Sequence, residues 1–195
     1  GQRVFCLFDD GMVSMRYAWN LAHGDGLVWN PGERVEGYTN LGHTLVMAVF
    51  ILLLGKFHAV AAIQVLGVVT VAVSAVLGLR IAERLSHDNG IEVTPFWQGV
   101  YLAASLAYYP LAYWSLMGME TGTLAALIAG AALVSLRGPE ERVSWLLVGL
   151  SAAAFLVRPD ALVPVGVIFL FRLVAMPRNA RALRLLLTEV GAIGR

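Results

Sequence analysis

Long apolar stretches separated by short polar segments dominate the pattern of this chain. A helix that spans a bilayer needs about 20 mostly apolar residues. Two of the stretches reach that length; three are shorter and need support at their ends from packing or snorkelling side chains. The five predicted spans are residues 59–82, 96–117, 121–136, 143–157 and 161–175. The pattern therefore predicts an all-α fold, a polytopic membrane protein.

The two ends of the chain continue this pattern. Residues 1–8 read as the end of a first span, and residues 183–195 as the start of a further one. We therefore expect the 195 residues to form one partial transmembrane domain, with more chain before and after it.

Residues 41–54 are apolar but too few to cross a bilayer. About 14 residues extend about 21 Å as a helix, against a hydrocarbon core of about 30 Å. Basic residues favour cytoplasmic loops, and the densest basic group is Arg178, Arg181 and Arg184. If this group is cytoplasmic, each span towards the N-terminus moves the chain to the other side of the membrane. Residues 9–58 then form one outer loop only if residues 41–54 do not cross the bilayer. We predict an interfacial or re-entrant helix there.

The same count puts the unusual polar clusters on one side of the membrane. Residues 9–10, 29–40, 118–121 and 158–160 are predicted outside, whereas the basic residues of 80–84 and 137–142 are predicted inside. An active site at the extracytoplasmic face of the inner or plasma membrane would produce such one-sidedness.

Composition agrees with a membrane protein. The chain is 58% hydrophobic and 14% charged, against about 45–50% and about 25% in soluble domains. The net charge of +1 and the lack of a basic patch with interleaved aromatics give no indication of nucleic-acid binding. Cys6 is the only cysteine, which excludes an intramolecular disulfide and a cysteine-rich metal site. His43, His58 and His87 have no metal-ligand spacing, so no metal or other cofactor is predicted from them.

Two adjacent carboxylates, Asp9 and Asp10, precede a helix predicted at 11–23. One of them could simply cap that helix. A carboxylate at the border of a low-dielectric region also has a raised proton affinity, which suits a general base. A third reading is a divalent cation held by the pair together with Glu120, although no spacing here resembles a dedicated ion-binding loop.

The predicted helix at 11–23 is amphipathic. Its apolar stripe is Met12, Met15, Trp19 and Ala22, and its polar face is Arg16, Asn20 and His23. If the helix begins at Asp9, that carboxylate shares a face with Arg16. The helix either frames a cleft at the membrane surface or is a plain interfacial helix with a solvated face.

The loop that follows combines a turn with an alternating polar strip. Asn30-Pro31-Gly32-Glu33 predicts a tight turn. After it, Arg34, Glu36, Tyr38 and Asn40 occupy alternate positions and would line one side of an extended chain. Such a strip suits the hydroxyl groups of a sugar, and a solvated loop face would have the same spacing.

Three further charged residues stand at predicted outer helix ends. Glu120 either caps the next helix or faces the site. Arg158 and Asp160 flank Pro159, a residue that favours a helix start. They form either a structural pair or, through the arginine, a site for a phosphate.

Together these residues resemble the GT-C class of polytopic glycosyltransferases, which use polyprenyl-phosphate sugar donors. The motifs are DDGMVSMRYAWNLAHGDGLVWNPGERVEGYTN (9–40), then GMET (118–121), then RPDAL (158–162). The first string is most similar to the bacterial branch with the terminal arabinofuranosyltransferases, and more distantly to protein mannosyltransferases and aminoarabinose transferases. The resemblance covers about residues 8–175. The first helix, later spans and a C-terminal soluble domain have no counterpart here, which leaves acceptor specificity open.

The resemblance implies interfacial helices in the first outer loop and inverting glycosyl transfer to a glycan, lipid or protein acceptor. Asp9 or Asp10 would deprotonate the acceptor hydroxyl, and Arg16 or Arg158 would stabilise the leaving prenyl phosphate. Glu120 would bind hydroxyl groups or act as a second acid. Asn30, Glu36, Tyr38, Asn40 and Asp160 complete the expected substrate-binding set. The rival hypotheses are a transporter, in which ionisable residues inside the membrane mark a pathway, and a non-catalytic membrane scaffold.

Overall fold

The structure, a computed structural model, describes residues 7–33, 35–136, 144–175 and 180–193, with the side chains of 180–182 left undescribed. These residues form α-helices, one short 3-10 helix and no strands, so the predicted all-α fold is confirmed. The elements in order are α1 (Asp9–Ala22), α2 (Leu41–Asp88), α3 (Pro95–Leu106), α4 (Tyr109–Leu116), α5 (Thr121–Ser135), α6 (Trp145–Val157), η1 (Pro159–Ala161), α7 (Leu162–Ala175) and α8 (Ala180–Ile193).

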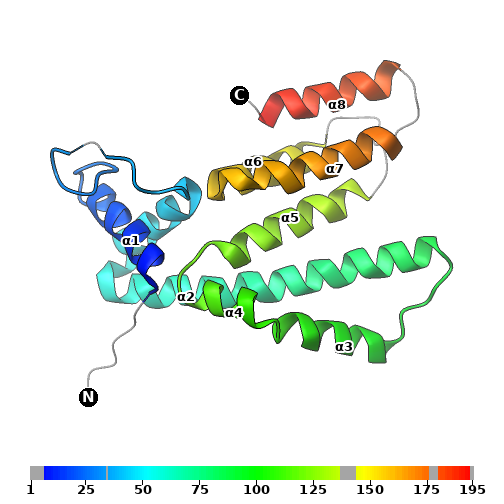
Figure 1. Cartoon of the computed structure of the whole chain (residues 1–195), viewed down its shortest axis with the longest axis horizontal. Coiled ribbons are helices and arrows are strands. Elements are labelled where there is room, and N and C mark those ends of the chain that lie inside the picture. The colour runs from blue at the N-terminus through cyan, green and yellow to red at the C-terminus, as the bar shows by residue number, and fades with distance from the viewer. Residues whose placement is uncertain (1–6, 34, 137–143, 176–179, 194–195) are drawn as a thin grey trace.

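From α2 onwards the helices run back and forth in a stack (Figure 1). Helix α2 packs on α5 and also on α3 and α4; α5 packs on α6, and α8 packs on α6 and α7. Helix α1 lies against the start of α2 at one end of the stack. One apolar core joins α1 to α2 through side chains such as Met15, Met47 and Ile63, and a second joins α5 to α8.

A kink divides α2 into two arms. Gly55 has φ 73° and ψ 168°, a positive-φ conformation that glycine adopts without steric cost. The kink separates residues 41–54 from the long arm that contains the predicted span 59–82. The kink thus falls between the two segments that the sequence pattern separates, and the position of the first arm relative to a membrane stays a prediction.

A proline divides the stretch predicted as one span at residues 96–117. The structure has two helices there, α3 and α4. Pro110 has no N–H to continue the hydrogen-bond ladder of α3, and it stands in the first turn of α4 instead. Similarly, Pro159 opens a 3-10 turn before α7.

Within the described residues, α2 is the one helix that is both long and apolar enough to cross a membrane, while α5 and α6 are apolar but shorter. Residues 183–193 of the predicted further span lie in α8. That helix buries Leu186 and the acidic Glu189 against its neighbours.

Candidate functional site

A polar network joins three segments at the end of the molecule where α1 lies. Asn40 precedes α2, Glu120 precedes α5, and Arg158 and Asp160 stand between α6 and α7. Asn40 donates from Nδ2 to Glu120 Oε2 at 2.9 Å, and Arg158 donates from Nη1 to Glu120 Oε1 at 2.9 Å. Arg158 Nε also donates to Asp160 Oδ2 at 2.9 Å. Four residues that the sequence singled out separately are therefore in one network.

Two hydroxyl groups extend this network towards α1. Ser14 Oγ donates to Asn40 Oδ1 at 3.0 Å, and Thr44 Oγ1 donates to the same oxygen at 3.1 Å. Ser14 also lies 3.3 Å from the carbonyl oxygen of Asp10. The sequence reasoning missed both hydroxyls, although each lies four residues after a residue it had selected, one helical turn away. We call Ser14, Asn40, Thr44, Glu120, Arg158 and Asp160 the Glu120 network.

Glu120 is buried, with 1% of its surface exposed. It occupies the N-cap position of α5, where an acidic residue is favourable, although its side chain makes no capping hydrogen bond. Both carboxylate oxygens instead accept hydrogen bonds from Asn40 and Arg158. Glu120 thus orients Asn40 and Arg158, and its direct contact with substrate hydroxyls stays a prediction.

The turn that carries Glu120 is held from two sides. Phe8 N–H donates to the Met117 carbonyl at 2.8 Å, and His43 Nε2 contacts the Gly118 carbonyl oxygen at 3.1 Å. Gly118 has φ 87°, and a Cβ there would lie 2.7 Å from the Leu7 side chain. The GMET segment therefore requires glycine for its geometry.

Arg158 has donors left over for a ligand. Its side chain is 36% exposed, and among the described residues its Nη2 has no hydrogen-bond partner. The pKa of Arg158 is raised, first by the hydrogen bond to Asp160 and then by Glu120, against the opposing effect of burial. The guanidinium is thus permanently charged and partly open to solvent.

Asp9 and Asp10 lie in the first turn of α1 and are exposed. Phe8 occupies the N-cap position, so the interpretation of an aspartate capping a helix that starts near Gly11 is wrong. Acidic side chains in the first turn still interact favourably with the helix dipole. Neither carboxylate has a side-chain partner within the described parts of the chain, so both are accessible from solvent.

Arg16 is held by uncharged groups. Its Nε donates to the Trp29 carbonyl at 2.9 Å and its Nη2 to Asn30 Oδ1 at 3.0 Å. Its guanidinium carbon lies 4.8 Å from the centre of the Trp29 ring. Asp9 shares the helix with Arg16, as expected, yet no ion pair joins them in the structure as described. The positive charge of Arg16 therefore has no direct carboxylate partner there.

Asn20 corrects the expectation of a solvated face on this helix. It is buried, and its Nδ2 donates to the Val28 and Trp29 carbonyls at 2.7 and 3.0 Å. The apolar stripe is also incomplete, because Met15 is buried whereas Met12 is 44% exposed. Helix α1 therefore uses part of its polar face to hold the loop.

The predicted turn at Asn30–Glu33 is confirmed. Glu33 N–H donates to the Asn30 carbonyl at 3.1 Å, Asn30 Nδ2 donates to Glu33 Oε2 at 2.9 Å, and Gly32 has φ 90°. A positive φ at the third position is the requirement of a type II turn. Asn30 thus connects Arg16 to this turn.

The predicted polar strip after the turn is split. Arg34 lies outside the described residues. Glu36 is exposed and Tyr38 is half-buried, whereas Asn40 is buried in the Glu120 network. The pKa of Tyr38 is raised, first by burial and then by Glu36 and Tyr17, which keeps its hydroxyl protonated.

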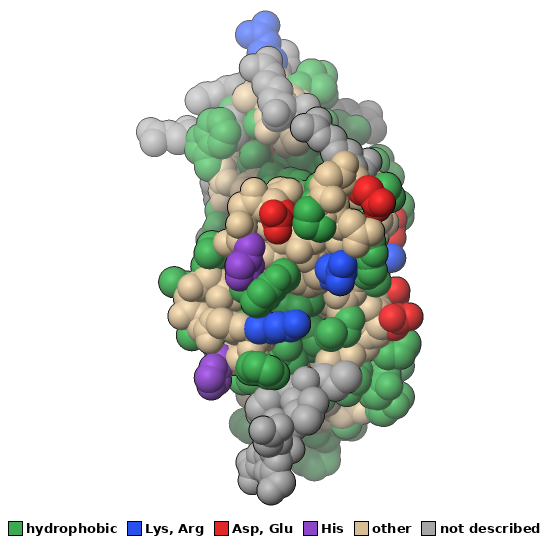
Figure 2. Space-filling model, turned by 90° about the vertical axis from the view of Figure 1, so that its left-hand side faces the viewer, with side chains coloured by type: hydrophobic (Ala, Val, Ile, Leu, Met, Phe, Trp, Pro, Cys, Tyr) green, Lys and Arg blue, Asp and Glu red, His purple; other side chains and the backbone are tan. Residues whose placement is uncertain are grey.

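Two cavities at this end share Glu36 and Tyr38. The loop cavity, of about 440 Å³, is lined by Asp25, Gly26, Leu27, Val28, Val35, Glu36 and Tyr38. The junction cavity, of about 330 Å³, is lined by Glu36, Tyr38, Thr39, Leu41, Phe155, Leu156 and Pro159. Pro159 places the junction cavity next to Arg158 and Asp160. Figure 2 faces this end, where charged side chains of both signs lie among hydrophobic ones.

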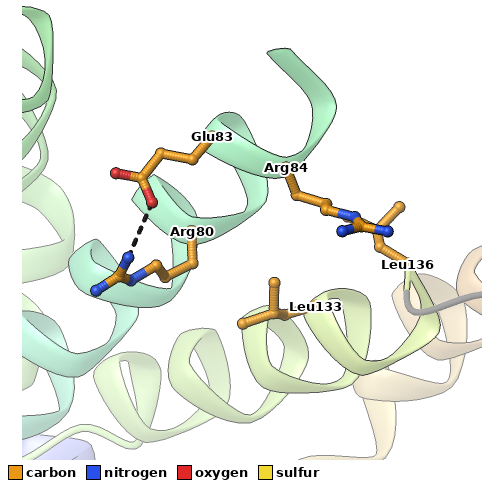
Figure 3. A pocket seen from close by; sticks show the side chains of 5 residues that line it. All are labelled: Arg80, Glu83, Arg84, Leu133 and Leu136. Atoms are coloured by element: carbon orange, nitrogen blue, oxygen red, sulfur yellow. Dashed lines mark hydrogen bonds and ion pairs between the residues drawn. The ribbon is translucent and has the colours of Figure 1, made fainter. Parts of the chain in front are cut away.

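A cavity of about 480 Å³ lies between the ends of α2 and α5, lined by Arg80, Glu83, Arg84, Leu133 and Leu136 (Figure 3). Arg80 pairs with Glu83 at 3.1 Å and Arg84 with Asp88 at 3.5 Å. Both arginines are exposed and neutralised by carboxylates of their own helix. In the part of the cavity lining that the structure describes, each charged side chain therefore already has a partner of opposite charge.

The geometry does not support the alternative of a divalent cation held by Asp9, Asp10 and Glu120. Both oxygens of Glu120 are occupied by Asn40 and Arg158, and the described residues contain no cluster of three His, Cys, Asp or Glu side chains suited to a metal.

No protein-family model matches this chain, and comparisons with curated proteins and with solved structures likewise give no match.

Proposed function

We propose that this chain is part of a polytopic membrane glycosyltransferase that transfers a sugar from a polyprenyl phosphate to a hydroxyl acceptor at the extracytoplasmic face. The observation that carries the proposal is the gathering of the predicted polar clusters at one end of the helix stack. Asn40, Glu120, Arg158 and Asp160 form one network there, and Ser14 connects it to the turn of α1 that carries Asp9 and Asp10.

The chemistry is an inverting displacement. Asp9 or Asp10 takes the proton of the acceptor hydroxyl, whose oxygen attacks the anomeric carbon. The bond from that carbon to the phosphate oxygen breaks on the opposite face, and prenyl phosphate leaves with the electron pair. Exposed carboxylates without a side-chain partner, as described for this pair, are accessible to an acceptor.

The leaving phosphate needs a cation, and the two candidate arginines differ in their surroundings. Arg158 already has two carboxylate partners, Glu120 and Asp160, which oppose the approach of an anion. Arg16 is oriented by a carbonyl, an amide oxygen and an indole ring, all uncharged. A preoriented guanidinium with its full charge is the better phosphate ligand. We therefore propose Arg16 as the main phosphate ligand and Arg158 as a second donor.

The test is donor consumption by the full-length protein in lipid nanodiscs. Release of polyprenyl phosphate from a panel of polyprenyl-phosphate pentoses and hexoses is measured by mass spectrometry, with a hydroxyl acceptor present. We expect release by the parent and a large loss in the double variant Asp9→Asn/Asp10→Asn, while Asp88→Asn, at the opposite end, serves as the matched control. A protein that moves a solute across the bilayer but consumes no donor is the transporter of the rival hypothesis.

The proposed orientation has its own test. Single cysteines at Glu33 and at Asp88 lie at opposite ends of the molecule and are exposed. In intact cells of a Cys6→Ser background, a membrane-impermeant thiol reagent should label Glu33→Cys and not Asp88→Cys. Labelling of both positions, or of Asp88→Cys alone, contradicts the orientation.

A further inference from the structure

The loop cavity is bounded by two stretches of the same loop, residues 25–28 and 35–38. Its volume of about 440 Å³ falls within the range of about 300–1,000 Å³ typical of small-molecule sites. Its lining includes two acidic residues, Asp25 and Glu36, the phenol-bearing Tyr38, and the apolar Leu27, Val28 and Val35. A few polar groups on a partly apolar wall are the usual composition of a ligand site.

Buried side chains of α1 hold both walls of this cavity. On one side the Asn20 side chain donates from Nδ2 to the Val28 carbonyl at 2.7 Å, and the backbone carbonyl of Asn20 accepts from the Asp25 N–H at 3.0 Å. On the other side Tyr17, 1% exposed, donates to the Val35 carbonyl at 2.9 Å and packs edge-on against Tyr38 with ring centres 5.0 Å apart. The walls are therefore preorganised, which lowers the entropic cost of binding.

Glycine at position 37 permits this arrangement. A Cβ there would lie 2.7 Å from the Tyr17 hydroxyl, so a larger residue would push the second wall away from α1. The close approach brings Glu36 and Tyr38 to the positions where they line the cavity.

The charges in the cavity select the kind of ligand. Ionised carboxylates only accept hydrogen bonds, so Asp25 and Glu36 favour a ligand rich in donors and disfavour an anion. The lining residues include no Lys or Arg among those that the structure describes. Tyr38 adds a ring face for stacking and a hydroxyl. A neutral, polyhydroxylated molecule satisfies all of these groups, and a phosphate does not.

We infer that the loop cavity is a subsite for a neutral saccharide, the acceptor of the transfer; this inference rests on the proposed function. The junction cavity shares the Glu36–Tyr38 wall and extends to Pro159, beside Arg158. The apolar chain of a lipid-linked donor suits Phe155 and Leu156 in the junction cavity, with Arg158 nearby only as the second hydrogen-bond donor to the phosphate. Acceptor and donor would then meet across the wall formed by Glu36 and Tyr38.

The test is direct binding of neutral tetrasaccharides to the full-length protein in nanodiscs, without donor. Arabinotetraose and mannotetraose are titrated by calorimetry, with inorganic phosphate as the anionic probe. We expect saturable binding of at least one tetrasaccharide, and inorganic phosphate should not compete with it, because any phosphate bound at Arg16 or Arg158 lies outside the residues that line the loop cavity. Loss of a charged hydrogen bond should weaken affinity about tenfold in Asp25→Asn and Glu36→Gln. Asp88→Asn and Glu83→Gln repeat the same changes at the opposite end and should bind as the parent does.

Tyr38 gives a further contrast, because Tyr38→Phe keeps the ring and should retain most of the affinity that Tyr38→Ala loses. Absence of saturable saccharide binding, or equal binding by the parent and by the Asp25 and Glu36 variants, overturns the inference. Donor consumption measured in parallel separates the two proposals. Saccharide binding without donor consumption supports the subsite and refutes the transferase, whereas transfer with an unchanged acceptor KM in Asp25→Asn and Glu36→Gln refutes the subsite alone.

Discussion

Among the residues that the structure describes, two buried glutamates are each paired with an arginine, and they stand in opposite kinds of surroundings. Glu120 is 1% exposed and Glu189 is 0% exposed. Arg158, the partner of Glu120, is 36% exposed and has unused donors, whereas Arg172, the partner of Glu189, is 5% exposed. A buried carboxylate therefore does not by itself indicate a ligand site. The exposure of its arginine partner to solvent is what distinguishes the two pairs.

The second pair joins α7 to α8. Arg172 Nη1 lies 3.3 Å from Glu189 Oε2, and Glu189 Oε1 accepts from the Ser144 N–H at 2.8 Å. Glu189 Oε2 has no hydrogen bond of good geometry. A buried ion pair gains little net free energy over apolar packing. We therefore interpret this pair as an interaction that fixes the orientation of α8 against α7.

The largest effect is expected when the fully buried pair of Arg172 and Glu189 is broken. Glu189→Ala leaves the charge of Arg172 buried without a partner, a change that typically costs about 3–5 kcal/mol. Denaturant unfolding of the purified protein should show this loss, with donor consumption per folded molecule unchanged. Glu83→Ala, which breaks the exposed pair with Arg80, is the matched control and should change stability by less than about 1 kcal/mol. Equal unfolding midpoints for the two variants would contradict the interpretation.

The acidic pair should affect rate instead of stability. Asp9→Asn keeps the size of the side chain and removes its basicity, so turnover should fall about a hundredfold or more, the usual contribution of a general base. Asp10→Asn should have the smaller effect, because Asp9 follows the preceding segment directly and shares a helix face with Arg16. Stability should not change, since both side chains are exposed.

Single-turnover kinetics with saturating donor measure this prediction, and donor binding is checked separately. If both variants bind donor and turn over at the parent rate, the acidic pair is structural. A loss of turnover in Glu36→Gln under those conditions would instead make Glu36, on the wall between the two cavities, the base.

A substitution of Glu120 tests its pair with the partly exposed Arg158. Glu120→Gln replaces one acceptor oxygen by an NH₂ group, although both neighbours, Asn40 and Arg158, are donors. One contact then becomes donor against donor, which should cost about 1–3 kcal/mol and release Arg158. We expect kcat/KM to fall about tenfold, and Asp160→Asn, which changes an exposed partner of Arg158, to have a smaller effect. Full activity of Glu120→Gln would show that the site does not depend on the network.

The sequence predicted the helical class, because this follows from the apolar pattern of the chain. It also grouped on one side the polar segments at residues 40, 120 and 158–160, which the structure joins in one network. It missed the division of 96–117, where Pro110 outweighs a continuous apolar run. Nor did it predict that the side chains of Asn20 and Glu120 turn inward. Their partners, the Val28 carbonyl and Arg158, are 8 and 38 residues away, and no local pattern specifies such contacts.

The smallest effect, and the one that sharpens the comparison most, is expected between the two arginines of the candidate site. Arg16 acts through an uncompensated charge, so Arg16→Lys should keep most donor affinity while Arg16→Ala raises the donor KM about tenfold. Arg158 acts through a fork that joins two carboxylates, and lysine cannot reproduce that fork. Arg158→Lys should therefore resemble Arg158→Ala. The donor KM and inhibition by free polyprenyl phosphate measure both effects, with Arg80→Ala as the control at the opposite end. Loss of polyprenyl-phosphate inhibition in Arg158→Ala but not in Arg16→Ala would reverse the assignment and make the partly neutralised arginine the phosphate ligand.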